Sequence, residues 1–203
     1  MTTKSKSPKA ESPKAESPKP ITPAAPIPGN ETFLSAKERM KLGQARLVED
    51  APRPDVVLIS SGICTEEAMR ATRALQQRGV ILRHLHVSTL KPFDDPRLIE
   101  LAAEARRGII TMENHVITGG LGSAVAERLA ECGAGRRLVR IGLRDTFAHG
   151  ASRAYLMKKF GLDASALVRE VEKLLDARFG IEEQELLAVR IEPVHSGVKA
   201  EAL

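Results

Sequence analysis

One stretch in the second half of the chain restricts the fold most, because it passes from a strand pattern to a helix pattern through glycines. Residues 109–112 form an apolar run typical of a buried strand, and the polar residues Glu113 and His115 follow it. The glycines of the next turn are Gly119, Gly120 and Gly122. From Leu121 onward, apolar residues recur every three or four positions, which predicts one face of a helix.

This order places Glu113 and His115 at the carboxyl end of a strand, the edge at which open α/β sheets usually bind ligands. Glycines allow a tight turn, and the free N–H groups of a helix start can bind an anion. Glu113 and His115 can also act as an acid–base pair. We favour a structural role, in which they hydrogen-bond across a subunit interface or close the strand end.

The rest of the chain repeats the alternation of strand and helix. Strand patterns occur at residues 56–59, 80–87 and 138–141, and Thr65 or a neighbour is expected to cap the first helix between them. Asp95 followed by Pro96, and later Asp163, are further helix starts. The predicted fold is a three-layer α/β domain: a mainly parallel sheet of four to five strands with helices on both faces.

The two ends differ from this domain. Residues 1–32 are rich in Ser, Pro, Lys, Ala and Glu, and Ser7-Pro8-Lys9-Ala10-Glu11 repeats at once, so we predict a disordered tail. A lead-in segment at 33–54 and the domain at 55–180 follow. The extension at 181–203 has a weaker pattern, in which residues 186–191 can add a strand or dock on a neighbour.

Composition excludes several classes of function. The longest apolar runs fall far short of the ~20 residues that span a bilayer. The net charge is +5, but five lysines and two glutamates place +3 of it in residues 1–30, so the domain itself does not predict a nucleic-acid surface. Cys64 and Cys132 lack metal-ligand spacing and are expected to be small core residues. We expect a cytoplasmic protein without a metal site.

Three further groups of residues are candidate sites. Arg144 and His149 can hold a phosphate, but an ion pair from Arg144 to Asp145 or Glu113, or solvent exposure, is favoured. His84 and His86 share a strand face, and without a third ligand nearby we expect hydrogen bonds at a surface or interface. A third group at the first strand end lacks the turn of a catalytic nucleophile and is expected to form turns and caps: Ser60, Ser61 and Cys64.

Several motifs together resemble the C-terminal domain of the transketolase family of thiamine-diphosphate enzymes, over about residues 43–175. They are Asp-Val-Val-Leu-Ile-Ser-Ser-Gly at 55–62, Thr-Leu-Lys-Pro-Phe-Asp at 89–94, Glu-Asn-His with Gly-Gly-Leu-Gly-Ser-Ala-Val-Ala-Glu within 113–127, and Arg-Asp-Thr-Phe at 144–147. The segment 145–150 is more similar to transketolase and deoxyxylulose-phosphate synthase than to the beta subunit of 2-oxoacid dehydrogenases.

The resemblance implies that this chain supplies little chemistry. In that family the cofactor lies between two other domains, which bind its diphosphate and its aminopyrimidine. This sequence has no Gly-Asp-Gly diphosphate motif, and we expect that it binds no thiamine diphosphate alone. The cofactor and a divalent metal are implied for a complex with transketolase-like chains that carry those domains, as a dimer or larger oligomer, without membrane or nucleic acid.

Three hypotheses follow. The first is a C-terminal subunit of a split transketolase-like enzyme, without catalytic or cofactor-binding residues of its own. The second is a non-catalytic interaction module derived from the same domain. The third, a nucleotide-phosphate site at Gly119, Gly120 and Gly122, ranks last because the motif is not GxGxxG and no acidic residue sits clearly at a second strand end about 20 residues on. Interface or anion-site candidates are Glu113, His115, Gly119, Gly120, Gly122, Arg144, Asp145 and His149.

Overall fold

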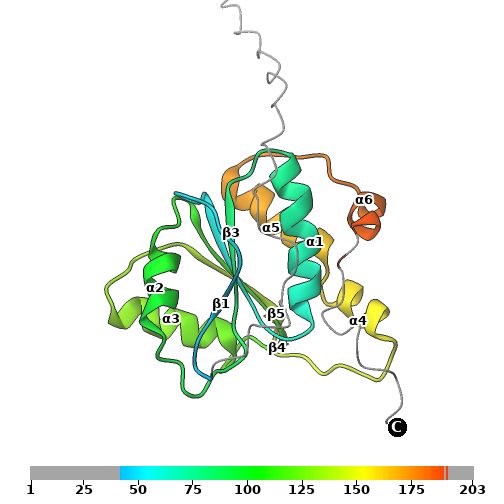
Figure 1. The fold of residues 1–203 in the computed structure, drawn as a ribbon. Helices are drawn as coiled ribbons and strands as arrows, with labels where there is room; N and C mark the ends of the chain where they lie inside the picture. The colour runs from blue at the N-terminus through cyan, green and yellow to red at the C-terminus, as the bar shows by residue number, and fades with distance from the viewer. Residues whose placement is uncertain (1–41, 190, 192–203) are drawn as a thin grey trace, which may run out of the picture.

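A computed structural model describes residues 42–189 and 191, and it contains one five-stranded sheet (Figure 1). The strands are β1 (Arg46–Glu49), β2 (Val56–Ser60), β3 (Leu82–His86), β4 (Gly108–Val116) and β5 (Leu138–Leu143). Their order across the sheet is β1-β3-β2-β4-β5, with β1 antiparallel to β3 and all other pairs parallel. The predicted α/β fold with a mainly parallel sheet is confirmed.

Helices cover both faces of the sheet, as predicted. The helices are α1 (Cys64–Gln77), α2 (Pro96–Ala103), α3 (Leu121–Glu131), α4 (Arg153–Lys159), α5 (Ala164–Leu175) and α6 (Glu183–Ala188). Figure 1 shows α2 and α3 on one side of the strands, with α1, α5, α4 and α6 on the other. Because β2 lies at the centre, all five of its residues are buried, which explains its continuous apolar pattern.

Each face of the sheet has its own hydrophobic core. Leu58 and Ile110 point to the side of α1 and α5, where Leu75 and Leu167 complete a fully buried cluster. Val57 and Ile109 point to the opposite side and pack with residues of α2 and α3. The alternation along β2 and β4 therefore divides the apolar side chains between two layers and fixes the register of the sheet.

Two of the three expected helix caps are present. Asp95 accepts a hydrogen bond from the N–H of Arg97 at 3.0 Å, and Asp163 accepts one from the N–H of Ala166 at 2.9 Å. The expected cap at the start of α1 is wrong: the N-cap residue is Ile63, which makes no side-chain cap. Thr65 lies inside the first turn, and its hydroxyl is bound elsewhere.

The segments on either side of the domain contribute to the same fold. Residues 46–49, in the lead-in segment, form the edge strand β1. Of the segment 186–191, the described residues 186–189 and 191 do not add a strand; the helix α6 forms at 183–188, and Leu186 is buried in the cluster that contains residues of α1. The tail at 1–32 and residues 33–41 of the lead-in segment lie outside the described residues.

The two cysteines occupy different environments. Cys64 is buried at the start of α1, as expected. Cys132 is exposed, because α3 ends at Glu131 and Cys132 is its C-cap residue, so its expected place in the core is wrong. Within the described part of the chain, no helix is long and apolar enough to cross a membrane.

Candidate functional site

The carboxylate of Glu113 occupies the helix start that the sequence offered as an anion site. Its Oε2 accepts the N–H of Leu121 at 2.7 Å, and its Oε1 accepts the N–H of Gly122 at 2.8 Å. The side chain is buried, with 1% of its surface exposed. One carboxylate thus satisfies two of the free N–H groups of α3 and places a negative charge at the positive end of its dipole.

The glycines beside Glu113 make room for this contact. A Cβ atom at Gly120 would lie 2.0 Å from Oε2 of Glu113 and 2.7 Å from the carbonyl oxygen of Val116. A Cβ atom at Gly122 would lie 2.7 Å from Cδ of Arg140, on β5. Gly119 differs, because open space surrounds it and its φ of +75° is what favours glycine there. The glycine turn is therefore shaped around a side chain of the same chain.

His115 is separated from Glu113 by an irregularity in β4. Met112 pairs with Ile141 and Val116 pairs with Leu143, so four steps along β4 match two along β5. His115 is exposed, and its Nδ1 donates to the carbonyl oxygen of Val116 at 2.9 Å. Glu113 instead turns into the protein, so the structure records no hydrogen bond between the two candidates among the described residues.

The loop after β5 faces outward. Arg144, Asp145 and His149 are all exposed, and neither Arg144 nor Asp145 makes an ion pair within the described residues. His149 accepts a hydrogen bond at Nε2 from Nζ of Lys159 at 2.8 Å, so it turns toward α4. Phe147 lies between them with its side chain fully exposed. The structure shows no contact that joins Arg144 to His149.

A buried chain of hydrogen bonds lies beneath the neighbouring strand ends. Ser60 Oγ bonds to His84 Nε2 at 2.8 Å and to Thr65 Oγ1 at 2.9 Å, and Thr65 Oγ1 bonds to His86 Nδ1 at 2.8 Å. Since His84 is fully buried, the expected surface position is wrong for this histidine, whereas hydrogen bonding is confirmed. The hydroxyl of Thr65 belongs to this series of hydrogen bonds, and Thr65 is the second residue of α1 and not its N-cap.

Burial keeps both histidines neutral. Loss of hydration lowers the pKa of His84 to about 3, with the charge of His86 as a second cause. Burial also lowers the pKa of His86 to about 4, and Arg46 adds repulsion. Among the described residues no group of three His, Cys, Asp or Glu side chains is placed to hold a metal ion. The two histidines therefore act as neutral hydrogen-bonding groups at ordinary pH.

The crevice between β2 and β4 is the point at which the strand order reverses, the usual ligand position in such sheets. Here a Cβ atom at Gly62 would lie 2.3 Å from Oδ1 of Asn114, so the side chain of Asn114 packs directly on the turn after β2. A diphosphate at the start of α3 would meet N–H groups already bound to Glu113, and a buried carboxylate would repel it. These residues do not fit the diphosphate of a cofactor.

Fold and site together define an open α/β domain in which the carboxylate of Glu113 occupies the glycine turn before α3. A family model described as "Transketolase, C-terminal domain" matches residues 43–167, which is more than half of the chain. The chain therefore belongs to the transketolase C-terminal domain family, as the motifs of the sequence indicate.

Relatives with this domain are longer proteins. The chain is 31% identical over 131 residues to a putative transketolase C-terminal section from Methanocaldococcus jannaschii, covering 64% of this chain and 40% of that protein. It is 35% identical over 145 residues to a 6-deoxy-6-sulfo-D-fructose transketolase subunit from a Clostridium species, covering 71% and 44%. The chain thus spans about two-fifths of the length of these curated relatives.

A solved structure supports the same assignment. It is described as "Split gene transketolase, inactive beta4 tetramer", and it is similar to this chain with a TM-score of 0.62 and 33% sequence identity. The similarity covers 71% of this chain and 45% of that chain. Both the family and the fold predicted from the motifs are confirmed.

Sequence reasoning did not find two features of this edge. The first is the chain of hydrogen bonds through Ser60 and Thr65, although the parallel pairing of β2 with β3 could have placed Ser60 beside His86. The second is the exposure of Phe147, which was seen only as part of a motif. A phenylalanine in a polar, glycine-containing loop is itself a signal, since such loops have no core of their own to bury it.

Proposed function

We propose that this chain is the C-terminal subunit of a split transketolase-like thiamine-diphosphate enzyme. In that complex it supports assembly for ketol transfer between sugar phosphates, while partner chains provide the diphosphate- and pyrimidine-binding domains. Thiamine diphosphate and a divalent metal belong to the complex, in the cytoplasm. Family membership supports this proposal, as do relatives that are described as a transketolase subunit and as a split-gene transketolase.

The observation that carries the proposal is the exposure of Phe147 at the carboxyl edge of the sheet. Ile63 follows β2 and Leu90 follows β3, and both are exposed at this same edge because parallel strands end together. Apolar side chains exposed along one edge of a sheet can form part of a surface that a partner covers, and an aromatic ring is a frequent anchor. We name the surface of Ile63, Leu90 and Phe147 the partner edge.

Polar candidates surround the partner edge. His115 lies near the end of β4, and Arg144, Asp145 and His149 flank Phe147 in the chain, so they are placed to form the polar rim of an interface. Glu113 lies behind them and holds the start of α3 in position. In this proposal the candidate residues named from the sequence are of two kinds: exposed residues at the rim of the interface, and the buried Glu113 that supports it. None of them is catalytic.

The direct test is reconstitution. The full chain is co-expressed with chains that carry the two cofactor-binding domains, and complex formation is measured by size exclusion with light scattering and ketol transfer by product formation. We expect a complex whose activity requires this chain. Phe147→Ser should weaken association at least tenfold, because it removes the anchor ring. Leu187→Ser is the matched control, since Leu187 is exposed on α6 and should leave association unchanged.

Two outcomes would contradict the proposal. Partner chains that are equally active without this chain would exclude a subunit role. A stable complex that has no thiamine-dependent activity under any substrate would instead favour the second hypothesis, a non-catalytic interaction module.

A further inference from the structure

The loops that precede three neighbouring strands carry exposed arginines, at the edge of the sheet opposite the partner edge. They are Arg53 before β2, Arg106 and Arg107 before β4, and Arg136 and Arg137 before β5. Because β2, β4 and β5 are parallel and adjacent, these strands begin side by side, about 4.8 Å apart from one strand to the next. We name the surface of these five residues the arginine edge.

Hydrogen bonds join the three loops into one continuous surface. The backbone N–H of Arg106 donates to the carbonyl oxygen of Pro54 at 2.9 Å, which ties the loop before β4 to the loop before β2. Nε of Arg136 donates at 3.0 Å to the carbonyl oxygen of Ala103, the last residue of α2. The loop before β5 is therefore tied to the segment that leads into β4.

Three carboxylates lie in the same loops, and each already binds an arginine. Asp55 binds Arg106 at 2.5 Å. Asp50 and Glu104 both bind the buried Arg83, on β3, at 2.8 Å each. The single charge of Arg83 offsets one of these two carboxylates. One negative charge therefore stands against the four remaining arginines of the arginine edge.

Those four arginines have no carboxylate partner within residues 42–189 and 191. Arg136 binds only backbone carbonyl oxygens. The guanidinium groups of Arg53, Arg107 and Arg137 make neither an ion pair nor a hydrogen bond in this part of the chain. The domain therefore does not use these three side chains for its own contacts.

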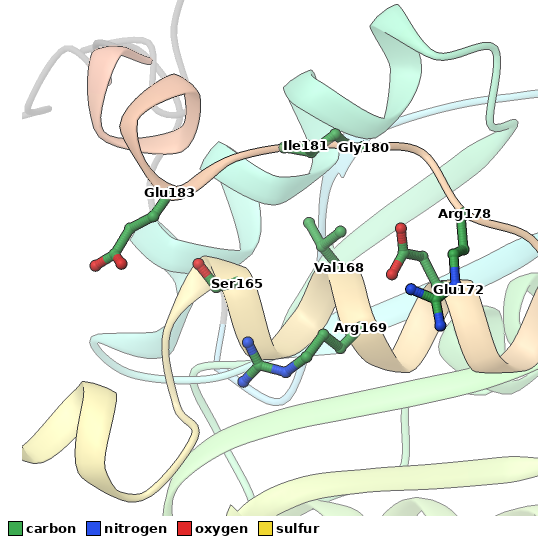
Figure 2. Close-up of a pocket in the computed structure, with 8 residues that line it drawn as sticks. All are labelled: Ser165, Val168, Arg169, Glu172, Arg178, Gly180, Ile181 and Glu183. Atoms are coloured by element: carbon green, nitrogen blue, oxygen red, sulfur yellow. The ribbon is translucent and has the colours of Figure 1, made fainter.

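The surplus of positive charge stops at the end of α5. A cavity of about 400 Å³ lies between α5 and the segment that follows it (Figure 2). Arg169 and Arg178 line this cavity together with Glu172 and Glu183, so two carboxylates stand beside two arginines. The arginine edge does not extend to this balanced region.

Arg53 is held in a backbone conformation that residues with a Cβ atom rarely adopt. Its φ is +49°, in the left-handed region. Pro52 and Pro54 flank it, and both restrict the chain around it. Among the described residues, no contact of its side chain compensates for this strain. A side chain on a backbone fixed in this way loses less entropy when a partner binds it.

We propose that the arginine edge binds an acidic segment of a partner polypeptide. The planar fork of a guanidinium group binds both oxygens of a carboxylate through parallel hydrogen bonds, and arginine is enriched at protein interfaces. Arginines spread along three adjacent strand starts match several carboxylates along one segment and do not need to converge on one small ligand. The inference is independent of the proposed enzyme subunit role, because the arginine edge lies opposite the partner edge.

A protein segment fits these loops better than a nucleic acid. None of the residues 50–55, 104–107 and 132–137 is aromatic, so no ring there can stack on a base. The side chains of Asp50 and Glu104 are about half exposed among the arginines and would repel a continuous phosphate backbone. A polypeptide can place carboxylates opposite the free arginines and avoid these two acids.

The test uses the full chain and a dye-labelled oligoglutamate peptide, with binding measured by fluorescence anisotropy at low ionic strength, since salt screens exposed charges. We expect saturable binding. The double variant Arg107→Gln/Arg137→Gln should weaken binding at least fivefold. Arg97→Gln/Arg169→Gln is the matched control, because it removes the same charge at two exposed arginines outside this edge and should change affinity less than twofold.

A third variant and a second probe make the result decisive. Arg53→Gly removes a guanidinium group, but glycine adopts a φ of +49° without strain, so affinity should fall at least twofold while Tm does not fall. Duplex DNA tests the other class of partner, and Arg107→Gln/Arg137→Gln should change its affinity no more than the control does. No binding of the peptide, an equal loss in both double variants, or a larger loss for DNA than for the peptide in Arg107→Gln/Arg137→Gln would each overturn the proposal.

Discussion

The ends of β4 and β5 lie side by side in the sheet, yet they differ completely in how their side chains are used. At the end of β4, Glu113 is buried and both of its oxygens bind the start of α3. At the end of β5, the loop from Arg144 to Gly150 is exposed throughout, and Phe147 has no cover. The end of β4 therefore contributes to packing within the domain, whereas the loop after β5 leaves its side chains exposed.

The comparison shows that a position at the carboxyl edge does not by itself define a binding group. The irregular pairing between Met112 and Val116 turns Glu113 inward, while His115 stays in solvent. Substitutions at the end of β4 are therefore expected to change stability, and substitutions at the end of β5 are expected to change association. Substitutions can test this division, from the largest expected effect on stability to the smallest.

Glu113→Ala should cause the largest loss of stability. It leaves two N–H groups of α3 without an acceptor and removes a buried side chain, so we expect the free energy of unfolding to fall by about 4 kcal/mol. Urea denaturation of the full chain measures this. Glu113→Gln is the control, because it retains an acceptor oxygen and should lose about half as much. A loss below about 1 kcal/mol for the alanine variant would show that the contact is unimportant.

Gly120→Ala should destabilise the same corner by about 3 kcal/mol, since a Cβ atom would lie 2.0 Å from Oε2 of Glu113 and must displace it. Gly150→Ala, in the loop after β5, meets nothing within 4 Å and should change stability by less than about 0.5 kcal/mol. Thermal unfolding of both variants measures the difference. Equal losses of stability at the two glycines would contradict the proposed contrast between the packed turn before α3 and the exposed loop after β5.

Acid should lower the free energy of unfolding, because His84 is buried in the folded protein. Burial lowers the pKa of His84 from 6.5 to about 3, so the unfolded chain binds a proton that the folded chain does not. Stability is therefore full above pH 6.5 and falls as pH drops from 6.5 toward 3, by about 2 kcal/mol at pH 5 from this residue. Chemical denaturation at pH 7 and pH 5 measures the change. His84→Asn should reduce this pH dependence, and an unchanged slope would exclude His84 as its source.

Phe147→Ser should have the smallest effect on the isolated chain. The ring contributes no burial, so the free energy of unfolding should change by less than about 0.5 kcal/mol in urea denaturation. The same variant is expected to lose association in the reconstitution test. A clear loss of stability in the isolated chain would show that Phe147 packs within the domain, and it would remove the basis of the partner edge.

Much of the fold follows from the sequence because local signals agree there. Apolar runs mark the strands, and Asp95 and Asp163 mark helix starts because each side chain accepts an N–H of the first helical turn. Helix α6 was harder to predict, since it has six residues, no side-chain cap and only Leu186 buried.

The site was less predictable because its contacts join distant residues. Thr65 resembles a cap, but it is drawn into the hydrogen bonds of Ser60 and His86, which come from two strands. Glu113 resembles a catalytic acid until the irregular pairing of β4 places it against Leu121. Such roles depend on register, and a pattern along one segment does not contain that information.

The unequal environments of the two thiols give this protein a single chemical handle. Burial raises the pKa of Cys64 to about 12, and its side chain is inaccessible, whereas Cys132 is exposed at the end of α3. A maleimide dye at neutral pH is therefore expected to label one position without any engineered mutation. A fluorophore there would lie on the α2 and α3 side of the domain, where rotational anisotropy could follow assembly in solution.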